Sequence, residues 1–135
     1  MLFQLDLTGT RPDDVFTEFW NNRQAEDELR SFAERLVWGV HRARHALDRL
    51  ISGSAEHWRV ERMAIVDRNV LRMAVYEMVT ERETPPAVII DEGIEIAKKF
   101  GSEDSGSFIN GILDSIRIRV ERDEIVGKDL AGEEA

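Results

Sequence analysis

Two of the three histidines have a spacing that can bind a metal ion. His41 and His45 lie four residues apart, so a helix would place both imidazoles on one face. No Asp or Glu stands three or four residues before either histidine, and Arg42 and Arg44 bring positive charge to the same place. We therefore expect an exposed pair of surface histidines and no metal site.

The residue patterns of common enzyme sites are also missing from the sequence. There is no Walker-type phosphate loop, no G-x-G-x-x-G and no H-E-x-x-H. The chain has no cysteine, so disulfides and thiolate chemistry are excluded. Glu92 and Glu95 could face each other on a helix, but no histidine or basic residue is placed beside them, which favours a solvated acidic face. We expect neither catalytic activity nor a cofactor.

Two features near the C-terminal end admit both a structural and a functional interpretation. Asp104 and Ser105 stand where a helix should begin, so their side chains could cap the helix or form part of a binding surface. Gly111 lies inside that helix, where glycine costs roughly 1 kcal/mol relative to alanine. Either close packing against another helix or close approach of a partner or an RNA would explain this glycine.

Length, composition and charge restrict the class of protein. The 135 residues suit a single domain, and a hydrophobic content of 42% is enough for a core. No apolar run is long enough for a membrane span and the first residues do not resemble a secretion signal, so we expect a cytoplasmic protein. The net charge of −9 argues against broad, non-specific binding of nucleic acid, but it permits a local basic strip and suits a basic protein partner.

The spacing of apolar residues predicts helices along most of the chain. Short helices are expected over residues 1–7 and 12–21, followed by one long amphipathic helix over about 25–51 that ends at Ser52-Gly53-Ser54. A second stretch begins at Glu56, breaks near residues 62–65 and stops at Thr84-Pro85-Pro86. A third helix is expected over about 86–100, with Phe100 on its apolar face, and a last helix starts after residues 102–104.

These elements predict an all-α, single-domain helical bundle. We expect two helical halves, residues 1–53 and 56–120, and a tail over residues 127–135 that frays because it is small, polar and acidic.

Three segments of the second half resemble the NusB family. Residues 67–78 (DRNVLRMAVYEM) resemble the family pattern D-R-x-x-L-R-x-A-x-Y-E-L. Residues 86–101 (PAVIIDEGIEIAKKFG) are similar to P-x-x-V-x-I-N-E-A-x-E-L-A-K-x-F-G. Residues 103–105 (EDS) and 108–114 (FINGILD) match E-D-S-x-x-F-V-N-G-V-L-D. The three blocks occur in the family's order and with its gaps, and residues 1–51 fit the family less sharply.

The resemblance implies a two-part helical bundle without catalytic residues. Such a protein binds single-stranded boxA RNA of ribosomal RNA leaders together with NusE, a ribosomal protein of the small subunit. Within the transcription complex, the pair helps RNA polymerase to read through terminators.

Site residues follow from the resemblance position by position. The implied RNA surface includes Asp104, Ser105 and Phe108, and Phe108 could stack on a base. The implied NusE-facing surface includes Phe3, Leu7 and Asp67. Phe3 and Leu7 could equally be core residues, and Asp67 could instead pair with Arg68 or Arg72.

The sequence departs from the family pattern at its beginning. Family members usually start with an arginine-rich segment that contacts RNA, whereas here the chain opens with MLFQL, which corresponds to a later part of the first helix. Either the start codon is assigned too late or the arm is missing. A missing arm predicts weak RNA binding, and the apolar surface left uncovered could drive formation of a homodimer.

Two hypotheses therefore stand. The first is an antitermination factor that binds RNA and NusE. The second is a NusB-like homodimeric scaffold or regulator with weak or lost RNA binding, which the missing arm and the net charge of −9 favour.

Overall fold

The structure, a computed structural model, describes residues 27–55 and 59–130, and this part of the chain contains helices and turns but no β-strand. The prediction of an all-α fold is confirmed. No helix in these two ranges is both long enough and apolar enough to cross a membrane. The elements, in chain order, are α3 (Asp27–Arg42), α4 (Arg44–Ser54), the 3₁₀ helix η1 (Val60–Arg62), α5 (Ile65–Thr80), α6 (Pro86–Phe100), α7 (Ser105–Glu121) and the 3₁₀ helix η2 (Gly127–Leu130).

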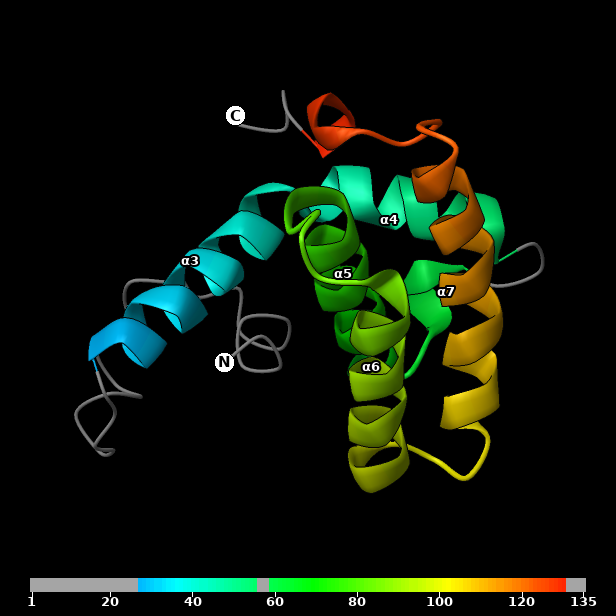
Figure 1. Cartoon of the computed structure of the whole chain (residues 1–135). Coiled ribbons are helices and arrows are strands. Elements are labelled where there is room, and N and C mark those ends of the chain that lie inside the picture. The colour runs from blue at the N-terminus through cyan, green and yellow to red at the C-terminus, as the bar shows by residue number, and fades with distance from the viewer. Residues whose placement is uncertain (1–26, 56–58, 131–135) are drawn as a thin grey trace.

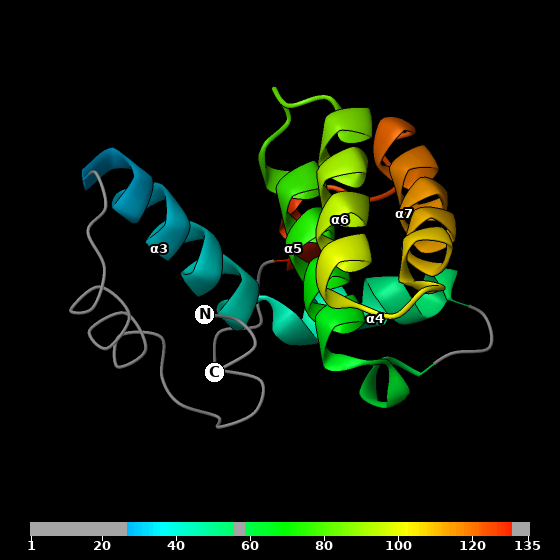
Figure 2. The same ribbon diagram turned by 90° about the horizontal axis from the view of Figure 1, so that it is seen from below.

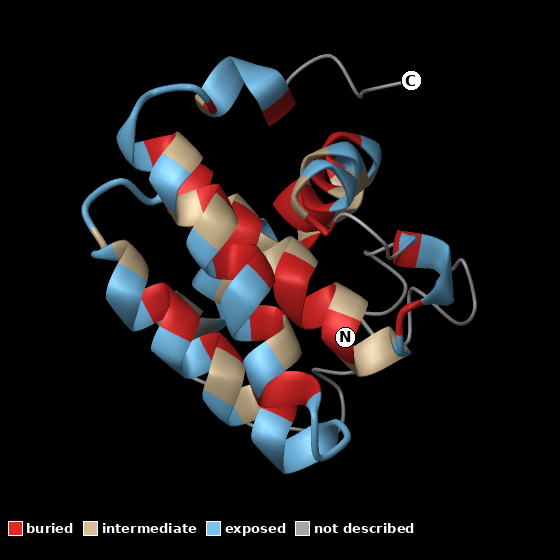
Figure 3. Cartoon of the chain, turned by 90° about the vertical axis from the view of Figure 1, so that its right-hand side faces the viewer, coloured by how far each residue is buried: buried red, intermediate tan, exposed pale blue. Residues whose placement is uncertain are grey.

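Helices α5, α6 and α7 form an antiparallel up-down-up arrangement, with α4 lying across them and α3 pointing away to one side (Figures 1 and 2). Buried residues recur along one side of the helices and exposed residues along the other (Figure 3). Gly93, in the middle of α6, shows how closely the three helices pack. A Cβ atom at Gly93 would lie 3.3 Å from Cγ1 of Val70 in α5 and 3.8 Å from Cδ1 of Leu113 in α7.

The bounds of α6 follow the local signals in the sequence. Pro86 occupies the first turn, where its missing N–H costs nothing, and Lys98 and Lys99 lie in the last turn, where they oppose the helix dipole. Gly101 follows as the C-cap, and its N–H donates to the carbonyl of Ala97 over 2.8 Å. The break predicted near residues 62–65 is confirmed as well, because η1 ends at Arg62 and α5 begins at Ile65.

The single long helix predicted over residues 25–51 is wrong, because α3 and α4 are separate helices that meet at Ala43. Ala43 has φ −91° and ψ 7°, and the chain changes direction there (Figure 1). The guanidinium of Arg44 donates to the carbonyl of His41 at this bend, over 2.6 Å. The apolar spacing runs through the bend without interruption, since Val40, Ala43 and Leu47 are all buried.

The start of the tail also differs from its prediction. Residues 127–130 form η2, which packs against α4, and Leu130 is only 8% exposed. The side-chain carboxylate of Asp129 accepts from the N–H of Val126 over 2.7 Å, which closes this turn. The prediction of a frayed tail is therefore wrong for residues 127–130, because Leu130 packs into the core and holds them. Residues 131–135 lie outside the described residues.

The helices predicted over residues 1–7 and 12–21 also lie outside the described residues. The division into halves at residues 53 and 56 stays a prediction. Within the described part of the chain, α4 packs against α5 and α7, so it shares its core with the helices that follow it.

Candidate nucleic-acid interface

One end of the three-helix arrangement brings an exposed aromatic ring and two lysines together. Phe100, the last residue of α6, is 65% exposed, and Nζ of Lys99 lies 5.7 Å from the centroid of its ring. The neighbouring surface forms a shallow hollow of about 520 Å³. Its lining residues are Glu95, Ile96, Lys98, Lys99 and Phe100.

Phe100 is the last residue on the apolar side predicted for α6, and it is not covered there. Ile89 and Ala97 on that side of the helix are buried, but Phe100 is exposed to solvent. Gly93 of α6 lies beside Val70 of α5. From this contact toward the C-terminal end of α6, α6 extends further than the antiparallel α5 does (Figure 1). The helical spacing of apolar residues could not reveal this difference in length, whereas the neighbouring Lys98 and Lys99 were a signal of an exposed end.

Phe108 lies in the first turns of α7, close to the same end. Its side chain is half-buried and packs against the core. Its N–H donates to the carbonyl of Asp104 over 3.1 Å. The two phenylalanines therefore lie on either side of the short turn between α6 and α7, one largely exposed and one partly covered.

Asp104 and Ser105 have different surroundings in this turn. Asp104 is exposed, and among the described residues its carboxylate makes no capping hydrogen bond at the start of α7, so capping by this side chain is wrong. Ser105 is only 1% exposed. Its hydroxyl accepts from the N–H of Ser102 over 2.9 Å, and the two serine hydroxyls lie 3.2 Å apart. Ser105 thus faces the turn and Asp104 faces solvent.

Asp67 lies in the first turn of α5, and α5 begins toward the end of the bundle at which α6 ends (Figure 1). It is 8% exposed, and its Oδ1 atom is buried without a hydrogen-bond partner in the described structure. Arg72 holds Asp48 of α4 through two hydrogen bonds, with Nε at 2.7 Å and Nη2 at 2.9 Å. Phe3 and Leu7, the other two residues predicted to face NusE, lie outside the described residues.

The interpretation that Gly111 allows close packing against another helix is wrong. Gly111 is exposed, and a Cβ atom placed on it would meet no atom of the described residues within 4 Å. Close packing occurs instead at Gly39, where a Cβ would overlap the ring and hydroxyl of Tyr76, and at Gly93. The intrinsic cost of a glycine inside a helix is visible in the sequence, but the neighbour that would justify it is not.

The histidine pair gathers no acidic ligand in the described structure. His45 is exposed, and His41 is partly buried with its ring 6.2 Å from that of Trp38. Among residues 27–55 and 59–130, no three His, Asp or Glu side chains come together as metal ligands would.

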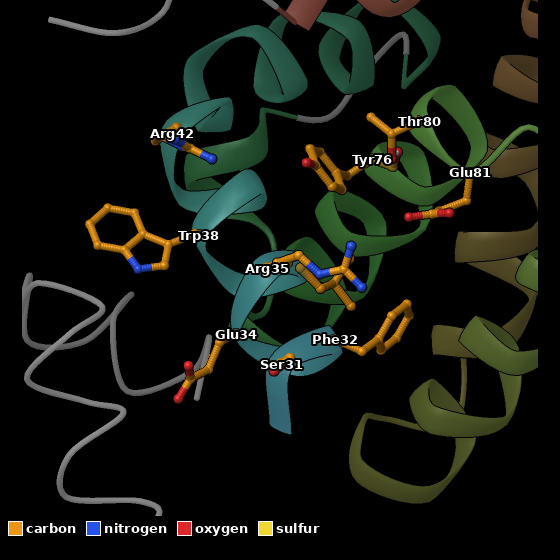
Figure 4. Close-up of a pocket in the computed structure, with 10 residues that line it drawn as sticks. Ser31, Phe32, Glu34, Arg35, Trp38, Arg42, Tyr76, Thr80 and Glu81 are labelled. Atoms are coloured by element: carbon orange, nitrogen blue, oxygen red, sulfur yellow. Dashed lines mark hydrogen bonds between the residues drawn. The ribbon is translucent and has the colours of Figure 1, made fainter. Parts of the chain in front are cut away.

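A second hollow, of about 720 Å³, lies between α3 and α5 (Figure 4). Phe32 and Arg35 of α3 point toward Tyr76 of α5, whereas Trp38 and Glu34 point to the other side of α3. Its other lining residues are Ser31, Leu36, Arg42, Thr80 and Glu81, so none of the residues singled out in the sequence as RNA- or NusE-facing lines it.

An acidic face lies beside this hollow. Partial burial, followed by the charges of Glu92 and Glu81, raises the pKa of Glu77 above its ordinary value of 4.5. Negative charge on this face would oppose the approach of another anion.

Known proteins match the chain over most of its length. The NusB family model matches residues 1–117. The transcription antitermination protein NusB of Sorangium cellulosum is 44% identical over 126 residues, which cover 91% of this chain and 90% of that protein. The structure of T. maritima NusB has a TM-score of 0.79 and 37% identity, with 92% of this chain and 89% of that chain covered.

A crystal structure of the antitermination factors NusB and NusE in complex with dsRNA also contains a similar chain. Its TM-score is 0.75 and its identity 28%, with 87% of each chain covered.

Proposed function

Because the chain belongs to the NusB family, we propose that it is a transcription antitermination factor that binds boxA RNA of ribosomal RNA leaders together with NusE. Its role in the cytoplasm is to help RNA polymerase read through terminators. No residue is assigned a catalytic role. The observation that carries the RNA half of the proposal is the exposed Phe100 beside Lys99, next to the turn that presents Asp104 and Phe108.

This end of the molecule has the two properties that single-stranded RNA requires. An exposed aromatic ring offers a face on which an unpaired base can stack, and each such stack contributes roughly 1–3 kcal/mol. Lys98 and Lys99 can bind the phosphates on either side of the base. Both lysines are exposed and offer positive charge on an acidic molecule, beside the exposed carboxylates of Glu95, Glu103 and Asp104.

The experiment that tests the RNA half uses the full chain in complex with NusE. After co-purification, a boxA oligonucleotide and a scrambled one are titrated at two salt concentrations. We expect the boxA sequence to bind more tightly, and the absence of any preference would remove this half of the proposal.

Variants of the two phenylalanines locate the site. F100A and F108A should each weaken boxA binding by roughly fivefold to a hundredfold, which corresponds to one lost stack. F32A is a matched control, because Phe32 is also an exposed phenylalanine but lies in α3 on the hollow beside α5. Equal losses in all three variants would contradict an RNA site at the end of α6.

For the NusE half, we propose that Asp67 receives a hydrogen-bond donor from NusE. Support comes from the match of Asp67 to the family pattern and from its place in the first turn of α5; its buried Oδ1 atom is not the contact atom. D67N should weaken the complex with NusE, whereas D91N, a change of the exposed Asp91 in α6, should leave it intact. If both variants bound NusE with equal affinity, Asp67 would not be part of the interface. We also propose Phe3 and Leu7 as residues that face NusE.

A homodimeric scaffold is the second candidate function, and the net charge of −9 favours it. Light scattering of the chain alone, over a range of concentrations, distinguishes the two functions. A stable dimer without boxA preference would support the scaffold, and a chain that binds boxA as one copy with one NusE would contradict it.

A further inference from the structure

The turn between α6 and α7 is closed by reciprocal hydrogen bonds between Ser102 and Ser105. The N–H of Ser102 donates to the hydroxyl of Ser105 over 2.9 Å, and the N–H of Ser105 donates to the carbonyl of Ser102 over 3.1 Å. The two hydroxyls are also within hydrogen-bond distance, at 3.2 Å. Three contacts between two residues therefore determine the path of the chain from the end of α6 to the start of α7.

Gly101 makes room for this arrangement. A Cβ atom at Gly101 would lie 2.5 Å from the Ser105 hydroxyl and 2.6 Å from the carbonyl of Ala97. Its φ of −100° is accessible to any residue, so the close approach, and not the backbone angle, requires glycine here. A hydroxyl that is 1% exposed and enclosed by Gly101 and Ser102 cannot reach an RNA in this conformation.

Backbone hydrogen bonds join this turn to the ends of the two helices that carry the aromatic residues. On the α6 side, the N–H of Gly101, which directly follows Phe100, donates to the carbonyl of Ala97 over 2.8 Å. On the α7 side, the N–H of Phe108 donates to the carbonyl of Asp104 over 3.1 Å. A change in the turn would therefore alter the spacing between the two rings.

We propose that Ser105 is a positioning residue for RNA binding, whose buried hydroxyl holds the turn between α6 and α7 and so sets the spacing of Phe100 and Phe108. The proposal rests on the proposed function and replaces a direct contact between Ser105 and RNA. Two stacking rings bind best when their separation is already that of the bound bases, because no ordering of the turn then opposes binding.

The positioning role and a direct phosphate contact predict different salt dependence. A residue that binds a phosphate contributes to the slope of log affinity against log salt, by about 0.7 per contact for a single strand. A residue that only holds the turn changes the affinity and leaves the slope as it was. The slope is therefore a readout that separates the two roles.

The test compares S105A with S107A in the complex with NusE, by titrating boxA RNA at several salt concentrations. Ser107 is an exposed serine in the first turn of α7 and serves as the control, because its hydroxyl donates to the carbonyl of Asp104 over a longer 3.3 Å and is not one of the contacts between Ser102 and Ser105. We expect S105A to bind RNA roughly two- to tenfold more weakly, in keeping with the loss of one hydrogen bond, with an unchanged salt slope and unchanged affinity for NusE. S107A should bind as the unchanged chain does.

Hydrogen exchange at the Ser102 amide reports on the turn itself. This amide should exchange faster in S105A than in the unchanged chain, because its acceptor is gone. G101A perturbs the same hydroxyl from the other side and should also weaken RNA binding without a change in slope. It provides a second variant if S105A does not fold.

Each outcome decides between the possibilities. A fall of about 0.7 in the slope for S105A would mean direct contact with phosphate and overturn the positioning role. Unchanged RNA affinity despite faster exchange at Ser102 would overturn it as well, while the proposed function would stand if the unchanged chain still prefers boxA. An unchanged chain without boxA preference would overturn both.

Discussion

Replacement of Gly111 by alanine should stabilise the protein by about 1 kcal/mol. Glycine inside a helix is about 0.8–1.0 kcal/mol less favourable than alanine, because it loses more backbone entropy on folding. Gly111 lies within α7, and a methyl group added at this exposed position would have no described atom within 4 Å. Nothing in the described structure therefore offsets this gain. For a chain of 135 residues, it corresponds to a rise in Tm of roughly 3–5 °C.

The assay is equilibrium unfolding in guanidinium chloride, followed by circular dichroism, together with thermal unfolding by calorimetry. G39A provides the contrast, because a methyl group there would overlap the ring of Tyr76 and should cost roughly 1–3 kcal/mol. A loss of stability in G111A would refute the reasoning, since it would require a neighbour that the described residues do not supply.

The same variant tests why the glycine is present. If a partner or an RNA approaches the backbone at Asn110 and Gly111, G111A should unfold at a higher temperature and yet bind NusE or boxA RNA more weakly. Higher stability with unchanged affinity for both would contradict the functional interpretation of this glycine.

Three further perturbations test the packing and the electrostatics. D48A removes both hydrogen bonds that Asp48 accepts from Arg72, which is 14% exposed, and should lower the free energy of unfolding by about 1–3 kcal/mol. E34A breaks the exposed pair with Arg30 and should lower it by under about 0.5 kcal/mol. Similar losses in the two variants would contradict the larger contribution of the pair between Asp48 and Arg72. Burial and two acidic neighbours raise the pKa of Glu77, so its ionised form opposes folding and stability falls as the pH rises from about 4.5 through the folded-state pKa. E77Q should therefore unfold at a higher Tm than the unchanged chain at pH 7 but not at pH 4, and an equal difference at both would disprove it. L130A should lose about 2 kcal/mol in denaturant unfolding, and a loss near zero would mean that η2 contributes nothing to the core.

Much of the fold could be predicted from local signals. The bounds of α6 agree because a proline in the first turn and a glycine after the last residue act on the backbone directly. The bend at Ala43 was missed because the buried stripe continues through it, and spacing records which residues are buried but not the direction of the helix axis. The family was recognised from three short blocks, since they keep both order and gaps.

The candidate site divides in the same way. The resemblance to the NusB family indicated Asp104 and Phe108, whereas the net charge only permitted a local basic strip and did not place it at Lys98 and Lys99. Only the tertiary structure decided that Ser105 is enclosed, that Phe100 reaches solvent and that Gly111 has no neighbour within 4 Å among the described residues. The physical reason is that periodicity describes one helix at a time, whereas exposure depends on where the neighbouring helices begin and end, and that is set by contacts between residues far apart in the chain.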